Sequence, residues 1–570
     1  MSKKVNYLRV GFALEKQVLV SVGKCATIQA MGSKEWRWVA IVTLALGVAS
    51  TLPYLAAWTM APAGQHFTGL LFNPQDGNSY IAKMRQGLEG SWLFRLPYTP
   101  EPQDGAPLYL FHLFLGHVAR WTGLPLIAVY HLARVVGGAA MLVMLYVLAA
   151  CVSDDAREPF GYGPLDRAQG ERRAIFLLAA LGSGLGWLVV FFGYQSADLW
   201  VPEAFPVYAL LANAHFPLSM GLMAGIAWCG LQIAGGKKQE TGGKKQEAGS
   251  KRQRWCGLGM ILGAVALGAI QPFGLAAVFG GLGVMLVARV VRERAFPWQA
   301  VGWVVLAGLV ALPYPLYMLQ AIQADPALAA WNAQNVTGSP PLWDWALSYG
   351  LVLALAVFGV VFAVRRGSDV DWLLVGWIGV TLVGMYLPWL PLQRRLSLGL
   401  GVPLGLSAGA GWWRGVRPHV KARWRGLALG LVVASCALTP VFLIVGHLAT
   451  APDFYLSDGE WAAVEWLREE GEPGTVVLCS PRMGLFVPAW AGQPVVYGHP
   501  FETVDAEARK AQVEAFWAGE MGPREREVFL QEGNVGYVLV DAEIEELEIG
   551  DWRLAFELDG ASVYDVGSDQ

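Results

Sequence analysis

Long apolar runs separated by short polar segments fill the chain from about residue 36 to residue 447. A helix needs about 20 apolar residues to cross a bilayer. The pattern predicts eleven such helices, at residues 36–57, 125–151, 174–193, 207–234, 255–270, 273–291, 299–319, 343–364, 371–390, 396–413 and 426–447. The run 255–291 is divided at Gln271-Pro272 because proline interrupts a helix. The shorter stretch 107–121 contains two histidines and an arginine, and we expect a re-entrant or interfacial helix there.

A different pattern begins near residue 450, where short strand-like and helix-like segments alternate. Residues 457–470 have a Ser457 cap and helical apolar spacing. Strands are expected at 475–478, 495–497, 537–540 and 561–564, and helices at 505–519 and 523–532. The sequence thus predicts three parts: an N-terminal extension (1–35), a transmembrane domain (36–449) and a soluble α/β domain (450–570).

Charge separates the two large parts of the chain. Residues 1–449 carry 35 Lys and Arg against 20 Asp and Glu, whereas residues 450–570 carry 7 against 25. With a cytoplasmic N-terminus, 28 of the 35 basic residues lie in inner segments, as the positive-inside rule requires. We therefore expect a protein of the plasma (inner) membrane with an extracytoplasmic C-terminal domain. Nucleic-acid binding is excluded because the soluble part is acidic.

An acidic side chain stands out in the first long outer loop. Asp76 precedes a segment in which Ile81, Met84 and Leu88 share one helical face, while Lys83 and Arg85 lie elsewhere. This spacing predicts a helix that lies flat on the outer membrane surface. An ionised carboxylate at such a helix start can act as a general base. The alternative is that Asp76 is only a turn residue.

A second outer loop brings further polar groups to the edge of a span. Asp198 and Glu203 occur in the loop, and Asn213 and His215 follow at the start of the next apolar run. Ionisable groups at such positions are candidate functional residues. The alternative is an aqueous loop with a capping carboxylate and a histidine whose hydrogen bonds are satisfied in the bundle.

Arginines occur on the outer side, against the charge rule. Arg394 and Arg395 end the segment L-P-L-Q-R-R, and Arg134 lies inside an apolar run. Guanidinium groups bind phosphate in a bidentate manner, so a lipid phosphate is a fitting ligand. The alternatives are a lipid anchor or an ion pair with the acidic tail for the pair, and snorkelling for Arg134.

One tight turn in the tail, Tyr497–Thr503, combines His499 with Glu502. It either faces the membrane site or is a structural turn. The sequence contains no H-E-x-x-H, P-loop or Ser/His/Asp motif, and its six cysteines form no C-x-x-C pair. Zinc-protease, ATP-driven and serine-type chemistry therefore have no support in the sequence.

The whole arrangement resembles the GT-C superfamily of membrane glycosyltransferases, near the protein-mannosyltransferase and aminoarabinose-transferase-like families of bacteria. The resemblance rests on D-G-N-S-Y-I-A-K-M-R-Q-G (76–87), N-A-H-F-P-L (213–218), L-P-L-Q-R-R (390–395) and Y-G-H-P-F-E-T (497–503). It implies transfer of a sugar from a polyprenyl-phosphate lipid to a hydroxyl of a lipid, glycan or protein acceptor, with inversion. Asp76, Glu203 and His215 become the candidate catalytic residues. The candidate substrate-binding residues are Tyr80, Arg134, Asn213, Arg394 and Arg395.

Two departures from the superfamily pattern limit what the resemblance implies. The tail lacks the oligosaccharyltransferase W-W-D signature, which argues against asparagine glycosylation. Asp198 and Glu203, the candidate ligands for Mg²⁺ or Mn²⁺, are five residues apart and form no D-x-E pair. A lipid or solute transporter and a non-catalytic scaffold remain the rival interpretations. Convergence of Asp76, Glu203, His215 and Arg394 at one outer cavity would favour the transferase.

Overall fold

The computed structural model describes residues 31–155, 165–235, 243–542, 544 and 552–567. Expectations for residues 1–30 and for most of the first GGKKQE repeat lie outside this part of the chain. The helices up to residue 450 are α2 (Ser33–Thr59), α3 (Pro74–Leu88), α4 (Leu110–Thr122), α5 (Leu126–Asp155), α6 (Leu165–Leu181), α7 (Gly186–Val189), α8 (Pro206–Leu211), α9 (His215–Gly235), α10 (Gly243–Ile270), α11 (Phe273–Glu293), α12 (Trp298–Ala311), α13 (Pro313–Ala324), α14 (Pro326–Gln334), α15 (Leu342–Arg366), α16 (Asp369–Gly384), α17 (Gly401–Gly411) and α18 (Arg425–Thr450).

These helices confirm a multi-pass helical membrane protein. Within the described residues, eight helices are long and apolar enough to cross a bilayer, and a ninth span forms if the bent pair Gln169–Leu181 and Gly186–Phe192 is counted as one. The two further predicted spans, 371–390 and 396–413, correspond to α16 and α17, which have only 16 and 11 residues. The first run continues from α16 into a non-helical loop that contains Pro388 and Pro391. The second begins in the 3-10 turn Gln393–Ser397 and continues beyond α17 into the π-helical turn Trp412–Val416. The expected division at Gln271-Pro272 is present, between α10 and α11.

The C-terminal part is an α/β unit, as predicted. Its four-stranded sheet has the order β3 (Val476–Leu478), β4 (Val535–Val540), β6 (Ala561–Asp565), β5 (Arg553–Leu558), with β3 and β4 parallel and the other pairs antiparallel. Its helices are α19 (Asp458–Glu469), α20 (Met483–Trp490), α21 (Ala506–Trp517) and α22 (Pro523–Glu532). Ser457 and Glu460 form the capping box that begins α19.

The structure of this unit differs from the sequence-based prediction at three places. The predicted strand 495–497 makes only an isolated bridge, from Val495 to Val477. The sequence pattern missed β5, which has no alternation of buried and exposed residues. It also missed α20, which is buried on all sides and therefore lacks the polar face of an amphipathic helix.

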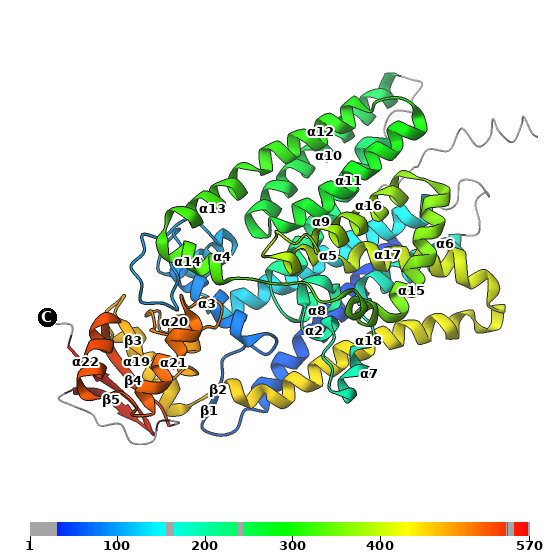
Figure 1. The fold of residues 1–570 in the computed structure, drawn as a ribbon. Helices are drawn as coiled ribbons and strands as arrows, with labels where there is room; N and C mark the ends of the chain where they lie inside the picture. Colours follow the sequence, from blue (N-terminus) through cyan, green and yellow to red (C-terminus); the bar gives the residue numbers. More distant parts are fainter. Residues whose placement is uncertain (1–30, 156–164, 236–242, 543, 545–551, 568–570) are drawn as a thin grey trace, which may run out of the picture.

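Helix α3, predicted to lie flat on the outer membrane surface, is covered by other parts of the chain on more than its apolar face. It is packed between α4 and α20, so that Lys83 and Arg85 are buried like the apolar face (Figure 1). Gly87 of α3 allows the close contact with α4, because an added Cβ would stand 2.1 Å from the carbonyl oxygen of Leu113. Helix α3 is thereby enclosed by two helices, α4 and α20, that are far apart in sequence.

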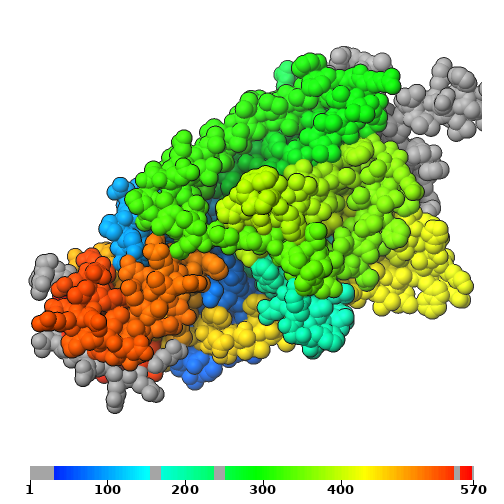
Figure 2. Space-filling view, in the orientation of Figure 1, coloured from blue at the N-terminus to red at the C-terminus, as the bar shows by residue number. Residues whose placement is uncertain are grey.

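The C-terminal unit is attached firmly at this end of the bundle. Strand β1 (Gln65–Phe67) of the first loop pairs antiparallel with β2 (Tyr455–Ser457). From α14, Gln334 Nε2 donates to the carbonyl of Thr503 at 2.5 Å and Asn335 Nδ2 to that of Phe501 at 3.0 Å. Figure 2 shows the green α13–α14 region bordering the orange C-terminal residues. The turn 497–503 is therefore held between the first loop and α14.

Candidate functional site

Asp76 occupies the first turn of α3, where the partial positive charge of the helix N-terminus favours a carboxylate. Asn73 precedes the helix in the left-handed conformation, with φ of 49°, and its Nδ2 donates to Asp76 Oδ2 at 2.6 Å. The Asp76 side chain is 37% exposed, whereas most of its helix is buried. This carboxylate is therefore anchored on one oxygen and accessible to a substrate.

The tail contributes a buried polar group directly beside this carboxylate. His499 Nε2 lies 3.7 Å from Asp76 Oδ1. Next to it, Glu502 Oε1 accepts hydrogen bonds from Lys83 Nζ at 2.6 Å and Ser79 Oγ at 2.5 Å. Lys83 also lies 4.5 Å above the Tyr109 ring. Helix α3 thus contacts the turn 497–503 through Glu502, which binds Lys83 and Ser79, and through His499, which lies near Asp76 without a hydrogen bond.

Arg394 and Arg395 lie in a short helical turn that is tied to two neighbouring loops. The Arg394 backbone N–H donates to the Thr337 carbonyl at 3.1 Å, and the Gly399 N–H donates to the Glu203 carbonyl at 2.9 Å. The Arg394 Nε atom lies 3.4 Å from Glu203 Oε1, and its guanidinium lies 5.0 Å from the Trp200 ring centre. Glu203 of the acidic loop and Arg394 of the pair are therefore neighbours in the structure.

Aromatic and imidazole rings line the same region. The Tyr80 ring stacks on His112 with centroids 4.6 Å apart and meets the His215 ring at 4.9 Å. Asn213 is fully buried, and its Oδ1 accepts from the Tyr130 hydroxyl at 3.1 Å. Within the described residues, both His112 nitrogens, His215 Nδ1 and Asn213 Nδ2 are buried without a hydrogen-bond partner. Buried polar atoms without a partner are uncommon, which marks this region as a candidate site.

The charged groups near these rings interact electrostatically with one another and with Tyr80. Burial raises the pKa of Tyr80 well above its ordinary value, Asp76 raises it further and Arg395 lowers it. Burial lowers the pKa of Arg395, but nearby acidic groups, Glu203 first and Asp76 among them, outweigh burial and leave it raised. Asp76, Glu203 and Arg395 therefore act on one another across the same region.

The contacts of Arg134 are those of a structural residue and give no support to the predicted substrate-binding role. Its guanidinium is 1% exposed and lies over the Tyr54 ring at 4.8 Å. Its hydrogen bonds go to Ser50 O and Oγ, Leu210 O, Thr51 Oγ1 and His131 Nδ1. The side chain is buried among these partners and does not snorkel. It joins α5 to α2 and α8.

Asp198 also has a structural environment, so Asp198 and Glu203 do not fit a divalent cation. The Asp198 carboxylate accepts four hydrogen bonds, from the N–H groups of Gly184 and Gly186 and from Ser196 and Thr439. These donors use the acceptor capacity of the carboxylate, and Glu203 is paired with Arg394. Across the described ranges, no group of three His, Cys, Asp or Glu side chains is arranged to hold a metal.

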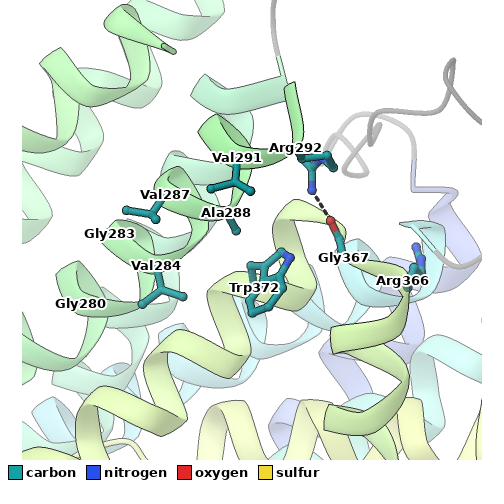
Figure 3. A pocket seen from close by; sticks show the side chains of 10 residues that line it. All are labelled: Gly280, Gly283, Val284, Val287, Ala288, Val291, Arg292, Arg366, Gly367 and Trp372. Carbon is teal, nitrogen blue, oxygen red and sulfur yellow. Dashed lines mark hydrogen bonds between the residues drawn. The ribbon is translucent and has the colours of Figure 1, made fainter. Parts of the chain in front are cut away.

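An open cavity of about 690 Å³ lies away from this site, between α11 and α16. Figure 3 shows Val284, Val287 and Val291 facing Trp372, with Arg292 donating to the Gly367 carbonyl. No histidine or carboxylate lines it. The cavity therefore offers no acid–base group, and the polar region beside Asp76 remains the candidate active site.

Sequence reasoning missed the partners that come from distant parts of the chain. Lys83 was expected away from the apolar face of α3, yet it pairs with Glu502, 419 residues later. His112 falls in the expected interfacial segment but had no assigned role. The one available signal for His499 was the density of polar groups in Y-G-H-P-F-E-T, which a turn explains equally well.

Solved structures with this architecture identify the fold. ArnT from Cupriavidus metallidurans superposes in its apo state with a TM-score of 0.52 at 13% identity, covering 92% of this chain and 98% of ArnT. The same protein bound to undecaprenyl phosphate gives 0.51 at 11%, covering 94% and 98%. The apo oligosaccharyltransferase of Archaeoglobus fulgidus gives 0.50 at 14%, covering 88% and 70%.

These likenesses show that the chain has the fold of the GT-C membrane glycosyltransferases, as the sequence motifs indicated. No protein-family model matches the sequence, and no curated protein sequence is significantly similar to it.

Proposed function

We propose that the protein is an inverting glycosyltransferase that moves a sugar from a polyprenyl-phosphate donor to an acceptor hydroxyl. The acceptor oxygen attacks the anomeric carbon while the bond from that carbon to the phosphate oxygen breaks. The hydroxyl proton passes to Asp76, and the lipid phosphate leaves with the bonding electron pair. The observation that carries the proposal is an accessible carboxylate, Asp76, one turn before Tyr80, on whose hydroxyl Arg395 also acts, with Arg394 next to Arg395 on the same short turn.

Asp76 is the candidate base because its Oδ1 atom, which has two lone pairs, keeps one of them for a proton even when it accepts a hydrogen bond. Asn73 orients the other oxygen, so the carboxylate can accept a proton without losing its position. Tyr80, Asn213 and His215 are the candidate sugar-contacting groups: Tyr80 and His215 interact with Asp76 and pack against each other, and Asn213 and His215 each have a buried polar atom without a partner. Glu203 acts through Arg394, whose guanidinium it orients.

The arginine pair is the candidate phosphate site. Two guanidinium groups on one short turn can bind a phosphate in a bidentate manner and stabilise the charge that develops on the leaving group. A lipid-phosphate donor agrees with ArnT, which has the same fold and was solved with undecaprenyl phosphate. Since Asp198 and Glu203 do not fit a metal, no step is assigned to one.

The side of the membrane follows from the charge distribution. We place the C-terminal unit and the site outside the cytoplasm, because 28 of the 35 basic residues of the membrane part fall in the opposite segments. A Glu507→Cys variant presents an exposed thiol on α21. An impermeant maleimide should label it on intact cells, with the unsubstituted chain as control. Protection from the reagent would place the site on the cytoplasmic side.

The test of the function uses the full chain in lipid nanodiscs with a panel of polyprenyl-phosphate sugars. The Asp76→Asn variant should lose about 10²–10⁴-fold in turnover, the usual contribution of a general base. Donor affinity should change little. Asp104→Asn, an exposed aspartate of the same loop, is the matched control. Normal turnover of Asp76→Asn, or a panel in which no donor binds, would contradict the proposal.

A further inference from the structure

His499 presents an unused hydrogen-bond donor to Asp76. Its ring is 1% exposed and its Nε2 atom stands 3.7 Å from Asp76 Oδ1. Within the described residues this nitrogen is buried and makes no hydrogen bond. A buried polar atom without a partner is costly and calls for an explanation. Asp76 is the carboxylate that it faces.

The position of the imidazole proton follows from the backbone. The Phe501 N–H donates to His499 Nδ1 at 3.1 Å, and a backbone N–H can only donate. The Nδ1 atom therefore carries the lone pair, and in the neutral ring the proton resides on Nε2. The group that faces Asp76 is thus an N–H donor, and Phe501 prevents the exchange of tautomers that a proton relay would need.

The turn that carries His499 is held rigidly from three sides. Glu502 binds Lys83 and Ser79 of α3, and Gln334 and Asn335 of α14 bind the carbonyls of Thr503 and Phe501. Gly498 rests against α20, where an added Cβ would stand 2.1 Å from the Gly484 carbonyl oxygen. A rigid support of this kind is what an orienting residue requires.

We propose that His499 is the positioning residue of Asp76, its Nε2–H donating to the carboxylate and holding it ionised and directed at the acceptor hydroxyl. The inference rests on the proposed role of Asp76 as the base. Such contacts are often long without substrate and shorten in the complex, which accounts for the 3.7 Å separation. The C-terminal unit then completes the active site by supplying one of its residues.

The charges around both groups agree with a neutral donor. Burial lowers the pKa of His499, whereas Glu502 and Asp76 raise it and Lys83 lowers it, and the result stays below the ordinary value of 6.5. The Tyr98 ring packs 5.4 Å from the imidazole. Besides Tyr80 of its own helix, the titratable groups that interact with Asp76 from the other packed elements are Tyr98, Tyr109, Tyr130, Tyr208, His215 and Arg395.

Two substitutions separate positioning from a structural role in the turn. His499→Gln keeps a donor near the Nε2 position but loses the acceptor for Phe501. His499→Asn keeps an acceptor near Nδ1 but loses the donor toward Asp76. We expect His499→Asn to reduce kcat about 10- to 150-fold, the effect of one charge-assisted hydrogen bond, and His499→Gln to recover most of it. The reverse order would show that the histidine serves only the turn and would overturn the proposal.

A second readout does not depend on sugar transfer. Carbodiimide modifies protonated carboxyl groups, so the pH dependence of Asp76 labelling, followed by peptide mass spectrometry, reports its titration. In His499→Asn the half-labelling pH should rise, because the ionised carboxylate loses a donor. In His499→Gln it should stay near that of the natural chain. Equal labelling profiles in all three proteins would overturn the proposal, even if the enzyme is active.

The two readouts also distinguish the failure of the inference from that of the proposed function. If the labelling profile shifts but no donor in the panel is consumed by the natural chain, the contact between His499 and Asp76 stands and the transferase assignment fails. If transfer occurs and the labelling profile does not shift, the assignment stands and the positioning role fails.

Discussion

Two sets of charged residues look equivalent in the sequence and differ in their surroundings. Arg134 and Asp198 lie inside the membrane bundle, where protein donors and acceptors occupy nearly all of their hydrogen-bonding capacity. Asp76 and His499 lie where the first loop meets the C-terminal unit, and each retains an unused polar atom. A satisfied buried charge holds helices together, whereas an accessible or unpartnered one can bind a substrate.

The largest effect on stability is expected at the ion pair between the two parts of the molecule. Glu502→Gln leaves Lys83 buried without a counter-charge, which should cost about 3–5 kcal/mol in the free energy of unfolding. The measurement is the thermal midpoint in detergent, with the exposed Glu507→Gln as control. An unchanged midpoint would show that the pair does not hold the C-terminal unit to α3.

The same pair predicts a pH dependence. Burial raises the pKa of Glu502, but Lys83 and then His499 lower it by more, so that it lies below its ordinary value of 4.5. A depressed carboxyl pKa stabilises the protein above the ordinary pKa, and this stability is lost as the pH falls through the folded-state pKa. The difference in thermal midpoint between the natural chain and Glu502→Gln should therefore shrink below about pH 4. A constant difference would contradict the assignment.

Arg134 should matter for folding and not for the reaction. Arg134→Met leaves several buried acceptors of α2, α5 and α8 without a donor, which should cost about 3 kcal/mol or more. The donor dissociation constant of the folded fraction should be unchanged. A large loss of donor affinity at normal stability would restore the phosphate-binding role that the sequence suggested.

Arg394 and Arg395 should show the opposite behaviour. Each alanine variant should weaken donor binding by about 10- to 150-fold, the effect of a bidentate guanidinium–phosphate contact. Lysine keeps the charge but loses the planar pair of donors, so it should recover only part of the affinity. Dissociation constants for all four variants decide the question. Complete rescue by lysine would reduce the pair to an electrostatic anchor.

Asp198 should give the smallest effect. In Asp198→Asn an amide replaces one acceptor oxygen in a set of four hydrogen bonds, which should cost about 1–3 kcal/mol in the free energy of unfolding. For each protein, the thermal midpoint should be nearly the same in EDTA and in Mg²⁺, and this should hold for the natural chain as well as for the variant. A midpoint that Mg²⁺ raises only in the natural chain would restore the predicted metal site.

Much of the architecture was determined by local sequence. The apolar runs predict the membrane helices, Gln271-Pro272 predicts the break between α10 and α11, and Ser457 with Glu460 predicts the start of α19. These features depend on neighbouring residues: a span needs only enough apolar length, and a cap needs only the correct side chain at one position. The sequence also identified Asp76 and the arginine pair as candidates, from their types and their places in the outer loops.

Only the tertiary structure decided which of the candidates lie together. Neighbouring residues do not indicate that Lys83 and Ser79 meet Glu502, or that His499 faces Asp76, because these pairs are more than 400 residues apart. Arg134 and Arg394 also have identical side chains. Only the acceptors that surround each guanidinium in the fold distinguish them. Hydrogen-bonding capacity is consumed by partners that folding brings together, so a sequence shows which groups are present and the fold decides which remain available for chemistry.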